Sequence, residues 1–243
     1  SIQLIQGDCL ELLQEVGDSS VDMVLCDLPF GTTGNDWDKA LPLAPLWAEW
    51  RRVCKENAAI VLFSDEPFTS KLIQSNPKSF RYKWIWDKLR GSNFANAKIM
   101  PMKCHEEILV FYRRKPTYNP QFWYSKPYRT KARPRAREIE GLSGSSAATI
   151  CAETVSEDGR RYPLSILRFP RDGNRVHPTQ KPVLLLEYLI KTYTNPGEVV
   201  LDNCMGSGST GVACLNTGRD FIGMEKEARY FEMARQRIEE ATR

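Results

Sequence analysis

The chain has 243 residues, of which 42% are hydrophobic and 26% charged, and its formal net charge is +4. This composition is that of an ordinary globular protein and excludes collagen-like repeats and coiled coil. The longest uncharged apolar runs are far shorter than the roughly 18 residues of a membrane span, and the seven cysteines form no C-x-x-C pair. We expect a cytoplasmic α/β protein of one large domain with an insertion, and no membrane partner, disulfide framework or metal site.

Short apolar runs, which predict buried strands, alternate with helical patterns in the first half of the chain. The expected strands lie at 2–5, 21–26 and 58–63, with a further pair at 82–86 and 108–112. One helix is expected after Asp8, which can cap its first turn. Another is expected at 43–54, where Leu46, Trp50 and Val53 share one face.

The same alternation continues in the second half. A helix is expected after Pro182, then a strand at 198–201, a helix at 209–215, a strand at 221–224 and a final helix. Strands that alternate with helices indicate a mostly parallel sheet covered on both faces. Residues 141–158 are small, polar and acidic, which is typical of a linker.

The segment from Arg113 to Arg137 contains nine basic residues and no acid. Five aromatic residues are interleaved with these charges, and four prolines discourage a continuous helix. Cations neutralise phosphates and aromatic faces stack on bases, so this composition favours a nucleic-acid partner. A solvated loop is the alternative.

Residues 199–210 (VVLDNCMGSGST) have the pattern of a strand, a glycine-rich turn and a helix start. Glycines allow a ligand to approach the backbone closely, and a helix N-terminus favours a negative group. A second strand ends at Glu225, whose carboxylate can accept hydrogen bonds from both hydroxyls of a ribose. The turn lacks the G-x-G-x-x-G fingerprint and the P-loop lysine. It therefore indicates a nucleoside without phosphates, with a purely structural turn as the alternative.

Two further motifs bear on function. Asp27-Leu28-Pro29-Phe30 follows a buried strand, at the end where open α/β sheets bind ligands. His177-Pro178-Thr179-Gln180-Lys181-Pro182 leads directly into a helix. Each motif alone could be a proline-rich turn. Together with Asp202, the glycine-rich turn and Glu225, in this order, they resemble the S-adenosylmethionine-dependent amino-DNA methyltransferases of the permuted β class.

That family methylates exocyclic amino groups of adenine or cytosine in DNA. The resemblance implies a seven-stranded, Rossmann-like, mostly parallel sheet with one antiparallel strand and helices on both faces. Its motif order is circularly permuted, so that the strand ending at Asp202 is structurally first. The resemblance covers 1–112 and 160–243, the expected catalytic core. It leaves 113–159 as an inserted target-recognition region.

The cofactor implied by the resemblance is S-adenosyl-L-methionine. Carried over by motif, Asp202 and the turn 206–210 hold its methionine part, and Glu225 holds its ribose. Lys181 and Thr179 meet its carboxylate, which a cation and a hydroxyl can satisfy. Asp8 matches the acidic position that contacts the cofactor's adenine, and a plain helix cap is its alternative. The expected cofactor-binding residues are Asp8, Cys9, Asp27, Thr179, Gln180, Lys181, Asp202, Met205, Gly206, Ser207, Gly208, Ser209, Thr210 and Glu225.

The expected catalytic residues are Asp27, Leu28, Pro29 and Phe30. Asp27 and the carbonyl of Leu28 can accept the two N–H bonds of the target amine, which concentrates its lone pair toward the methyl group. The base must leave the duplex, and Phe30 can stack against it. The usual family motif has proline where this chain has Leu28 and commonly tyrosine where it has Phe30. Neither change removes an essential group.

Double-stranded DNA is the expected partner, and Asp27 favours adenine because cytosine enzymes of this family usually carry serine there. Homodimers are common in the family, and the sequence leaves this state open. The alternatives are an N4-cytosine methyltransferase, a non-catalytic DNA-binding protein that retains the fold, and an NAD-dependent oxidoreductase. The expected DNA-binding residues are Arg113, Arg114, Arg129, Lys131, Arg133, Arg135 and Arg137.

Overall fold

The computed structural model describes residues 1–31, 40–92, 94–131, 154–173 and 180–242. The chain forms two units, which we describe separately. The core unit comprises Ser1–Asn119 and Ser165–Arg243, and the inserted unit comprises Pro120–Leu164. Among the described residues, no helix combines the length and apolar character needed to cross a membrane.

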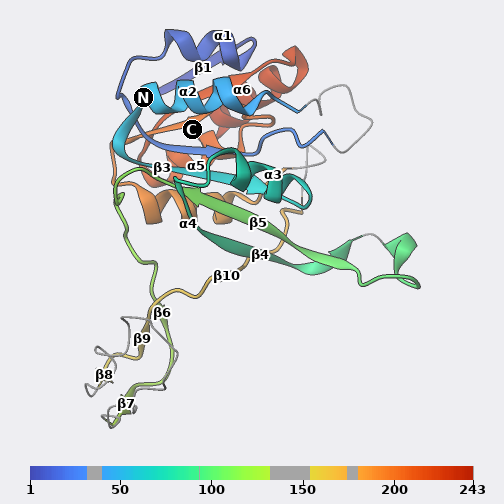
Figure 1. The fold of residues 1–243 in the computed structure, drawn as a ribbon. Helices are drawn as coiled ribbons and strands as arrows, with labels where there is room; N and C mark the ends of the chain where they lie inside the picture. The colour runs from blue at the N-terminus through green and yellow to red at the C-terminus, as the bar shows by residue number, and fades with distance from the viewer. Residues whose placement is uncertain (32–39, 93, 132–153, 174–179, 243) are drawn as a thin grey trace. The chain divides into compact units, whose positions relative to one another are not determined.

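The core unit is built on a sheet of eight strands in the order β1-β12-β11-β2-β3-β5-β4-β10 (Figure 1). Their bounds, in this order, are Ile2–Gln6, Asp220–Glu225, Val199–Asp202, Val21–Cys26, Cys54–Ser64, Lys103–Phe111, Phe80–Ser92 and Ile166–Arg168. Neighbouring strands are parallel except at β5, which is antiparallel to both β3 and β4. The α/β fold class is therefore confirmed. The expected count of seven misses β10, whose three residues are too few to show an alternating pattern.

Helices cover both faces of the sheet. They are α1 (Cys9–Leu12), α2 (Leu43–Val53), α3 (Phe68–Ser75), α4 (Val183–Tyr193), α5 (Ser209–Thr217) and α6 (Ala228–Ala241), with short 3-10 turns η1 (Leu13–Glu15) and η2 (Phe94–Asn96). One buried apolar cluster joins the sheet to α4, α5 and α6, through residues such as Leu189, Ala213 and Ile238. A second joins the opposite face to α1, α2 and α3, through residues such as Trp50 and Leu72. Helix α3 was not expected from the sequence.

The strand order reverses direction between β11 and β2. From β11 the chain passes through α5 to β12, toward one edge of the sheet, whereas from β2 it passes through α2 to β3, toward the other edge. Such a reversal leaves a crevice outside the carboxyl ends of the two strands, where open α/β sheets bind ligands. The permuted chain order thus places residues after β2 beside residues after β11.

The inserted unit contains two short antiparallel ladders. Strand β6 (Trp123–Tyr124) pairs with β9 (Arg160–Arg161), and β7 (Tyr128–Thr130) pairs with β8 (Thr154–Ser156). Strand β8 lies within the stretch expected to be a linker, so that expectation is wrong for 154–156. The rest of that stretch up to 153 lies outside the described residues.

Candidate functional site

Four carboxylate residues lie at the carboxyl ends of four neighbouring parallel strands. Asp8 follows β1, Glu225 ends β12, Asp202 ends β11 and Asp27 follows β2. Neighbouring strands are about 4.8 Å apart, so the row from β1 to β2 is roughly 14 Å long. A ligand lying extended across these strand ends could meet each carboxylate with a different polar group.

Asp202 is buried, and its two oxygens hold the start of the next segment. Oδ1 accepts the backbone N–H of Cys204 at 3.1 Å, and Oδ2 accepts the hydroxyl of Thr210 at 2.6 Å. Burial raises the pKa of Asp202 to about 7 against these hydrogen bonds. Its charge near neutral pH therefore depends on what lies next to it.

The glycine-rich turn between β11 and α5 is shaped by α6. Gly208 has φ +76°, and a Cβ there would lie 2.8 Å from Cβ of Ala234, so only glycine fits. Arg237 donates from Nη1 to the carbonyl of Ser207 at 2.6 Å and to the hydroxyls of Ser207 and Ser209 at 2.9 and 3.2 Å. These two serine hydroxyls thus hold the turn in place. A Cβ on Gly206 would meet no atom within 4 Å, so the turn faces open space at that residue.

Glu225 supports the same turn from β12. Its Oε2 accepts the N–H of Gly206 and its Oε1 the N–H of Glu227, each at 2.9 Å. A carboxylate oxygen has two acceptor sites, so both oxygens can accept a further hydrogen bond from a ligand. Met205 lies buried below the turn, with its N–H bonded to the carbonyl of Met224 at 2.9 Å.

Asp8 is the N-cap of α1, as the alternative interpretation of the sequence predicts. Its Oδ1 accepts the N–H of Leu10 at 3.0 Å, and its Oδ2 lies 3.1 Å from Nζ of Lys226. The hydrogen bond from Lys226 lowers the pKa of Asp8. Cys9 is buried in the apolar core, where a hydrogen bond with Cys204 raises the pKa of its thiol. Contact of either residue with a cofactor stays a prediction.

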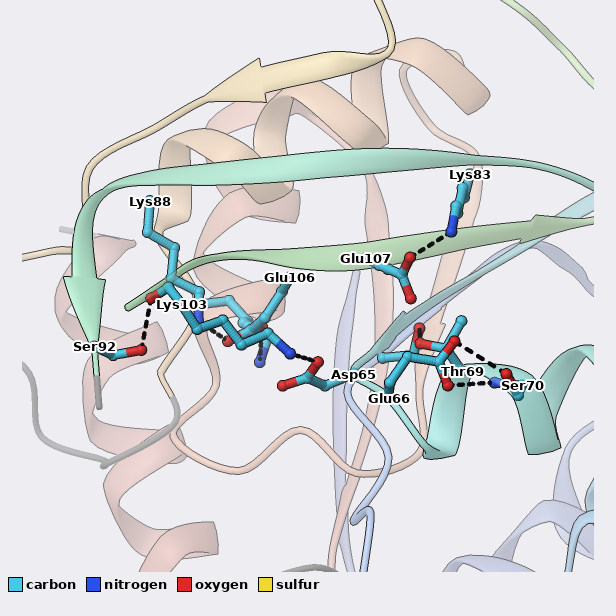
Figure 2. Close-up of polar contacts among 12 residues, drawn as sticks. Asp65, Glu66, Thr69, Ser70, Lys83, Lys88, Ser92, Lys103, Glu106 and Glu107 are labelled. Atoms are coloured by element: carbon cyan, nitrogen blue, oxygen red, sulfur yellow. Dashed lines mark hydrogen bonds and ion pairs between the residues drawn. The ribbon is translucent and has the colours of Figure 1, made fainter. Parts of the chain in front are cut away.

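Asp27 belongs to an ion network of two carboxylates and two ammonium groups. Nζ of Lys181 lies 2.7 Å from Oδ2 of Asp27 and 3.1 Å from Oε2 of Glu106. Nζ of Lys88 lies 2.5 Å from Oε1 of Glu106. Both lysine side chains are less than a tenth exposed, at 9% for Lys181 and 5% for Lys88. Glu107, the next residue of β5, points to the other face of the sheet and pairs with Lys83 (Figure 2).

The network changes the proton affinity of each member. Burial raises the pKa of Asp27, although Lys181 opposes this shift. Burial alone would raise the pKa of Glu106 as well, but Lys181 and Lys88 together lower it to about 2. Burial favours loss of the Lys181 proton, yet the two carboxylates raise its pKa. Glu106 is thus a fixed negative charge that keeps Lys181 protonated beside Asp27.

Lys181 was expected at the cofactor's carboxylate, and here it pairs with Asp27 and Glu106. The neighbouring Gln180 is also engaged within the protein, since its amide donates to Oδ2 of Asp172 at 3.2 Å. Thr179, the third expected member of this motif, lies outside the described residues. The contact between this motif and a cofactor stays a prediction.

The residues of the motif that follows β2 have different surroundings. Leu28 is buried in the apolar cluster on the α2 side, and Pro29 is partly buried. Oδ1 of Asp27 is buried and has no hydrogen-bond partner among the residues that the structure describes. Such an oxygen costs about 1–3 kcal/mol unless a donor reaches it, so it suits a ligand N–H. The ring of Phe30 stacks on Phe68, the first residue of α3, with centroids 5.0 Å apart.

The expected DNA-binding residues are not all on one part of the molecule. Nη2 of Arg113 donates to the carbonyl of Cys54 at 3.0 Å, and Nε of Arg114 lies 2.9 Å from Oε1 of Glu56. Because β3 begins at Cys54, both arginines lie near the amino ends of the parallel strands. Asp27 lies at the opposite end, where these strands finish. Arg129 and Lys131 are exposed in the inserted unit. The remaining three, Arg133, Arg135 and Arg137, lie outside the described residues.

The inserted unit presents aromatic side chains together with cations. Trp123, Tyr124 and Tyr162 are exposed. The guanidinium of Arg160 lies 4.6 Å from the ring centre of Phe122, and that of Arg161 lies 3.7 Å from the ring centre of Tyr128. These contacts orient flat, positively charged groups on a small unit with aromatic surface.

The sequence interpretation missed four residues at this site. Lys88 and Glu106 complete the ion network, Phe68 supports Phe30, and Arg237 holds the glycine-rich turn. The two adjacent acids Glu106 and Glu107 within an apolar strand were the one available signal, because charged side chains are costly to bury unless paired. The other three have no local pattern that distinguishes them.

Comparisons with known proteins identify the family of this chain and proteins of similar fold. The sequence profile of the DNA methylase family matches residues 21–236. The DNA adenine methyltransferase YhdJ of Escherichia coli (strain K12) is 28% identical over 262 residues, which cover 98% of this chain and 83% of that protein. The crystal structure of the M1.HpyAVI–SAM complex is similar with a TM-score of 0.65 at 25% identity, covering 98% of this chain and 100% of that one.

A further solved structure, the PvuII DNA methyltransferase (cytosine-N4-specific), is similar with a TM-score of 0.70. It is 16% identical and covers 99% of this chain and 90% of that one, so the likeness concerns the fold alone.

Proposed function

Because the chain belongs to the family of amino-DNA methyltransferases, we propose that it transfers a methyl group to the N6 amino group of adenine at specific sites in double-stranded DNA. S-adenosylmethionine is the methyl donor. One observation carries the proposal: Asp27 directly follows β2 and Asp202 ends β11, and these adjacent parallel strands lie where the strand order reverses. A target amine at Asp27 and a methyl donor at Asp202 would therefore be neighbours.

The row of carboxylates fits this donor. S-adenosylmethionine carries an ammonium group and ribose hydroxyls and has no phosphate, and it supplies an electrophilic methyl group when bound. Asp202 would pair with the ammonium group, and Glu225 would accept the ribose hydroxyls. Asp8 lies at the far end of the row, where the adenine would be. The site has the anionic hydrogen-bond acceptors that a cationic, hydroxylated ligand needs.

Asp27 would orient the target amine. The lone pair of an exocyclic amine is delocalised into the ring, which makes the nitrogen a poor nucleophile. The unpartnered Oδ1 of Asp27 can accept one N–H, and the carbonyl of Leu28 can accept the other. These hydrogen bonds localise the lone pair on the nitrogen and aim it at the methyl group, so the rate gain comes from positioning and electrostatics.

Lys181 is a positioning residue in this scheme. It fixes Oδ2 of Asp27 at 2.7 Å and thereby leaves Oδ1 for the amine. Glu106 and Lys88 balance the added charge, so the four ionised groups sum to zero and no net charge is buried. Phe30, supported by Phe68, offers a ring on which an extruded base can stack.

The inserted unit would contribute target recognition. Arg129 and Lys131 are exposed in a unit that also exposes aromatic side chains, and Arg133, Arg135 and Arg137 continue the same basic run in the sequence. Cations that neutralise phosphates together with rings that stack on bases suit DNA. Arg113 and Arg114 lie near the amino ends of the parallel strands, at the opposite end from Asp27, and we do not assign them to the DNA-binding surface.

Expression in a methylation-deficient host, followed by single-molecule mapping of modified bases, tests the proposal. We expect N6-methyladenine within one short sequence, and none when Asp27→Ala, which removes the acceptor oxygen, replaces the wild type. N4-methylcytosine instead would establish the second candidate, which the fold of the PvuII enzyme makes a fair alternative. An Asp27→Ala variant that methylates at the normal rate would show that Asp27 takes no part in the reaction. A folded wild type that binds DNA without modifying it would indicate a non-catalytic DNA-binding protein.

A further inference from the structure

The hairpin formed by β4 and β5 extends past the rest of the sheet at the edge that holds the site. The last pair between β3 and β5 joins Ser64 to Glu107. Beyond it, β4 and β5 continue to a final pair between Ser92 and Lys103. Because β3 and β4 both run antiparallel to β5, the hairpin projects from the carboxyl edge, on which Asp27 and Asp202 lie. Figure 1 shows the two strands reaching out beyond β3, with a short helical turn at the end.

The hairpin is tied to the site at its base. Lys88 of β4 and Glu106 of β5 are members of the ion network around Asp27. Lys103 of β5 pairs with Asp65, directly after β3, and its carbonyl accepts the hydroxyl of Ser92 at 2.8 Å (Figure 2). The described part of the tip also has internal bonds, from the N–H groups of Ala97 and Ile99 to the carbonyls of Phe94 and Asn96. The hairpin and its tip are therefore held in place by ion pairs and hydrogen bonds.

The surface of this tip is apolar and basic. Phe94, Ile99 and Leu89 are 82%, 78% and 57% exposed. Arg90 and Lys98 are also exposed, and the sequence from Lys88 to Lys103 contains no acid. Large apolar side chains gathered on a projecting element mark an interaction site. The absence of acids favours a polyanion as the partner.

We propose that this tip is a wedge that enters the DNA duplex beside the target base, with Phe94 and Ile99 placed against the base stack. The inference rests on the proposed function, since it assumes that the base bound at Asp27 comes from a duplex. Proteins that unstack base steps insert apolar side chains and flank them with cations, which is the composition of this tip. The hairpin also projects from the site edge itself, so a wedge there would act close to the base that has to leave the stack.

The test uses a duplex that carries the methylation site found by mapping, in two forms. In one form the target base is paired, and in the other it faces an abasic position, so no base pair has to be opened. For the double variant Phe94→Ala/Ile99→Ala we expect the methylation rate on the paired duplex to fall about tenfold or more. On the abasic-opposed duplex it should stay within about threefold of wild type. The single variant Ile166→Ala is the matched control, because Ile166 is also an exposed apolar residue of the core unit, and it should leave both rates unchanged.

Equal losses on both duplexes, or no loss on either, would overturn the wedge. Wild type that sediments as a dimer, with the double variant a monomer, would also overturn it and assign the tip to a second copy of the chain. A second readout needs no methyl transfer: 2-aminopurine at the target position should brighten when wild type binds and remain quenched with the double variant at saturating protein. Brightening of 2-aminopurine with both proteins would count against the wedge. This conclusion does not depend on which base the protein methylates. Mapping that finds no modified base would instead count against the proposed function.

Discussion

Nζ of Lys181 lies 2.7 Å from Oδ2 of Asp27 and 3.1 Å from Oε2 of Glu106, so one ammonium group pairs with both carboxylates. The three residues come from α4's leading segment, from the end of β2 and from β5, so three separate parts of the core unit meet at one nitrogen atom. Glu106 acts on Asp27 in two ways: it anchors Lys181, and its negative charge raises the pKa of Asp27. The two effects can be separated by mutation.

We expect Glu106→Gln to lower kcat about tenfold, equivalent to about 1.4 kcal/mol of lost positioning. The acidic limb of the pH–rate profile should also move to lower pH, because the pKa of Asp27 falls when the charge of Glu106 is removed and Asp27 must be ionised to act. Stopped-time methylation assays between pH 5 and pH 9 measure both effects. Glu107→Gln is the matched control, since Glu107 adjoins Glu106 in β5 and pairs with Lys83 on the other face. An unshifted profile in Glu106→Gln would separate Glu106 from Asp27.

Asp202 predicts a proton linkage in cofactor binding. Burial raises its pKa to about 7, and an ammonium group beside it would favour the ionised form. Cofactor binding should therefore release protons near pH 7, and affinity should increase as the pH rises from about 6 to about 8. Calorimetry in two buffers of different ionisation enthalpy measures the release, and Asp202→Asn should abolish it. Proton release that persists in this variant would assign the linkage to another group.

The same shift affects the stability of the protein without cofactor. The folded-state pKa of Asp202, about 7, exceeds its ordinary value of 3.8, so the folded protein binds the proton more tightly than the unfolded chain. The contribution of this group is fully present below about pH 4 and is lost as the pH rises to about 7. Relative to wild type, Asp202→Asn should therefore gain stability as the pH rises across this window, as measured by urea unfolding. A constant difference between the two proteins would contradict the raised pKa.

Gly208 should be the least replaceable residue of the glycine-rich turn. Gly208→Ala adds a methyl group 2.8 Å from Ala234 and also forces alanine into a left-handed conformation, which by itself costs about 1–2 kcal/mol. Gly218→Ala is the matched control: its φ is +72°, and no atom lies within 4 Å of the added Cβ. We expect Gly208→Ala to lose more stability than Gly218→Ala by chemical denaturation. Only Gly208→Ala should weaken cofactor binding.

The basic run of the inserted unit predicts a salt dependence. If each cation contacts one phosphate, neutralising Arg129, Lys131, Arg133 and Arg135 should lower the slope of log affinity against log salt by roughly 0.9 per contact. Fluorescence anisotropy with a duplex at several salt concentrations measures this slope. Arg113→Gln/Arg114→Gln should leave the slope unchanged. Arg113 is bonded to the carbonyl of Cys54 and Arg114 is paired with Glu56, at the opposite end of the parallel strands from Asp27. A slope that falls in Arg113→Gln/Arg114→Gln and not in the other variant would assign DNA recognition to Arg113 and Arg114.

The sequence was sufficient for the residues that follow strands. Asp27, Asp202 and Glu225 each end a short apolar run, so local patterns predicted that they lie at the carboxyl ends of strands. The family resemblance implied that they share one site. Glu106 and Lys88 could not be found in this way. Their place depends on the register between β4 and β5, in which Trp86 faces Glu106, and no local pattern fixes that register.

Helix α3 was not predicted either, because its position also depends on tertiary packing. It has eight residues and begins directly after Pro67, and only its packing against the α2 side of the sheet shows why Phe68 is buried. The pairing of Lys181 with Asp27 was also not predicted. The family resemblance assigned Lys181 to the carboxylate of the cofactor instead. Arg237 lies on the last helix, and only the tertiary structure brings it to the glycine-rich turn.

The pairing of β2 with β11 has a consequence for how the molecule is made. Met23 and Val24 of β2 find their partners in Val200 and Leu201, which are synthesised much later. Contacts between distant segments form slowly, and a chain emerging from the ribosome folds what is already available. Until β11 arrives, one edge of the buried strand β2 has no partner, and an open apolar edge is prone to wrong pairing. We expect nascent chains that stop before β11 to aggregate or to be held by chaperones, and the cofactor to have no place to bind until β11 and β12 have been made.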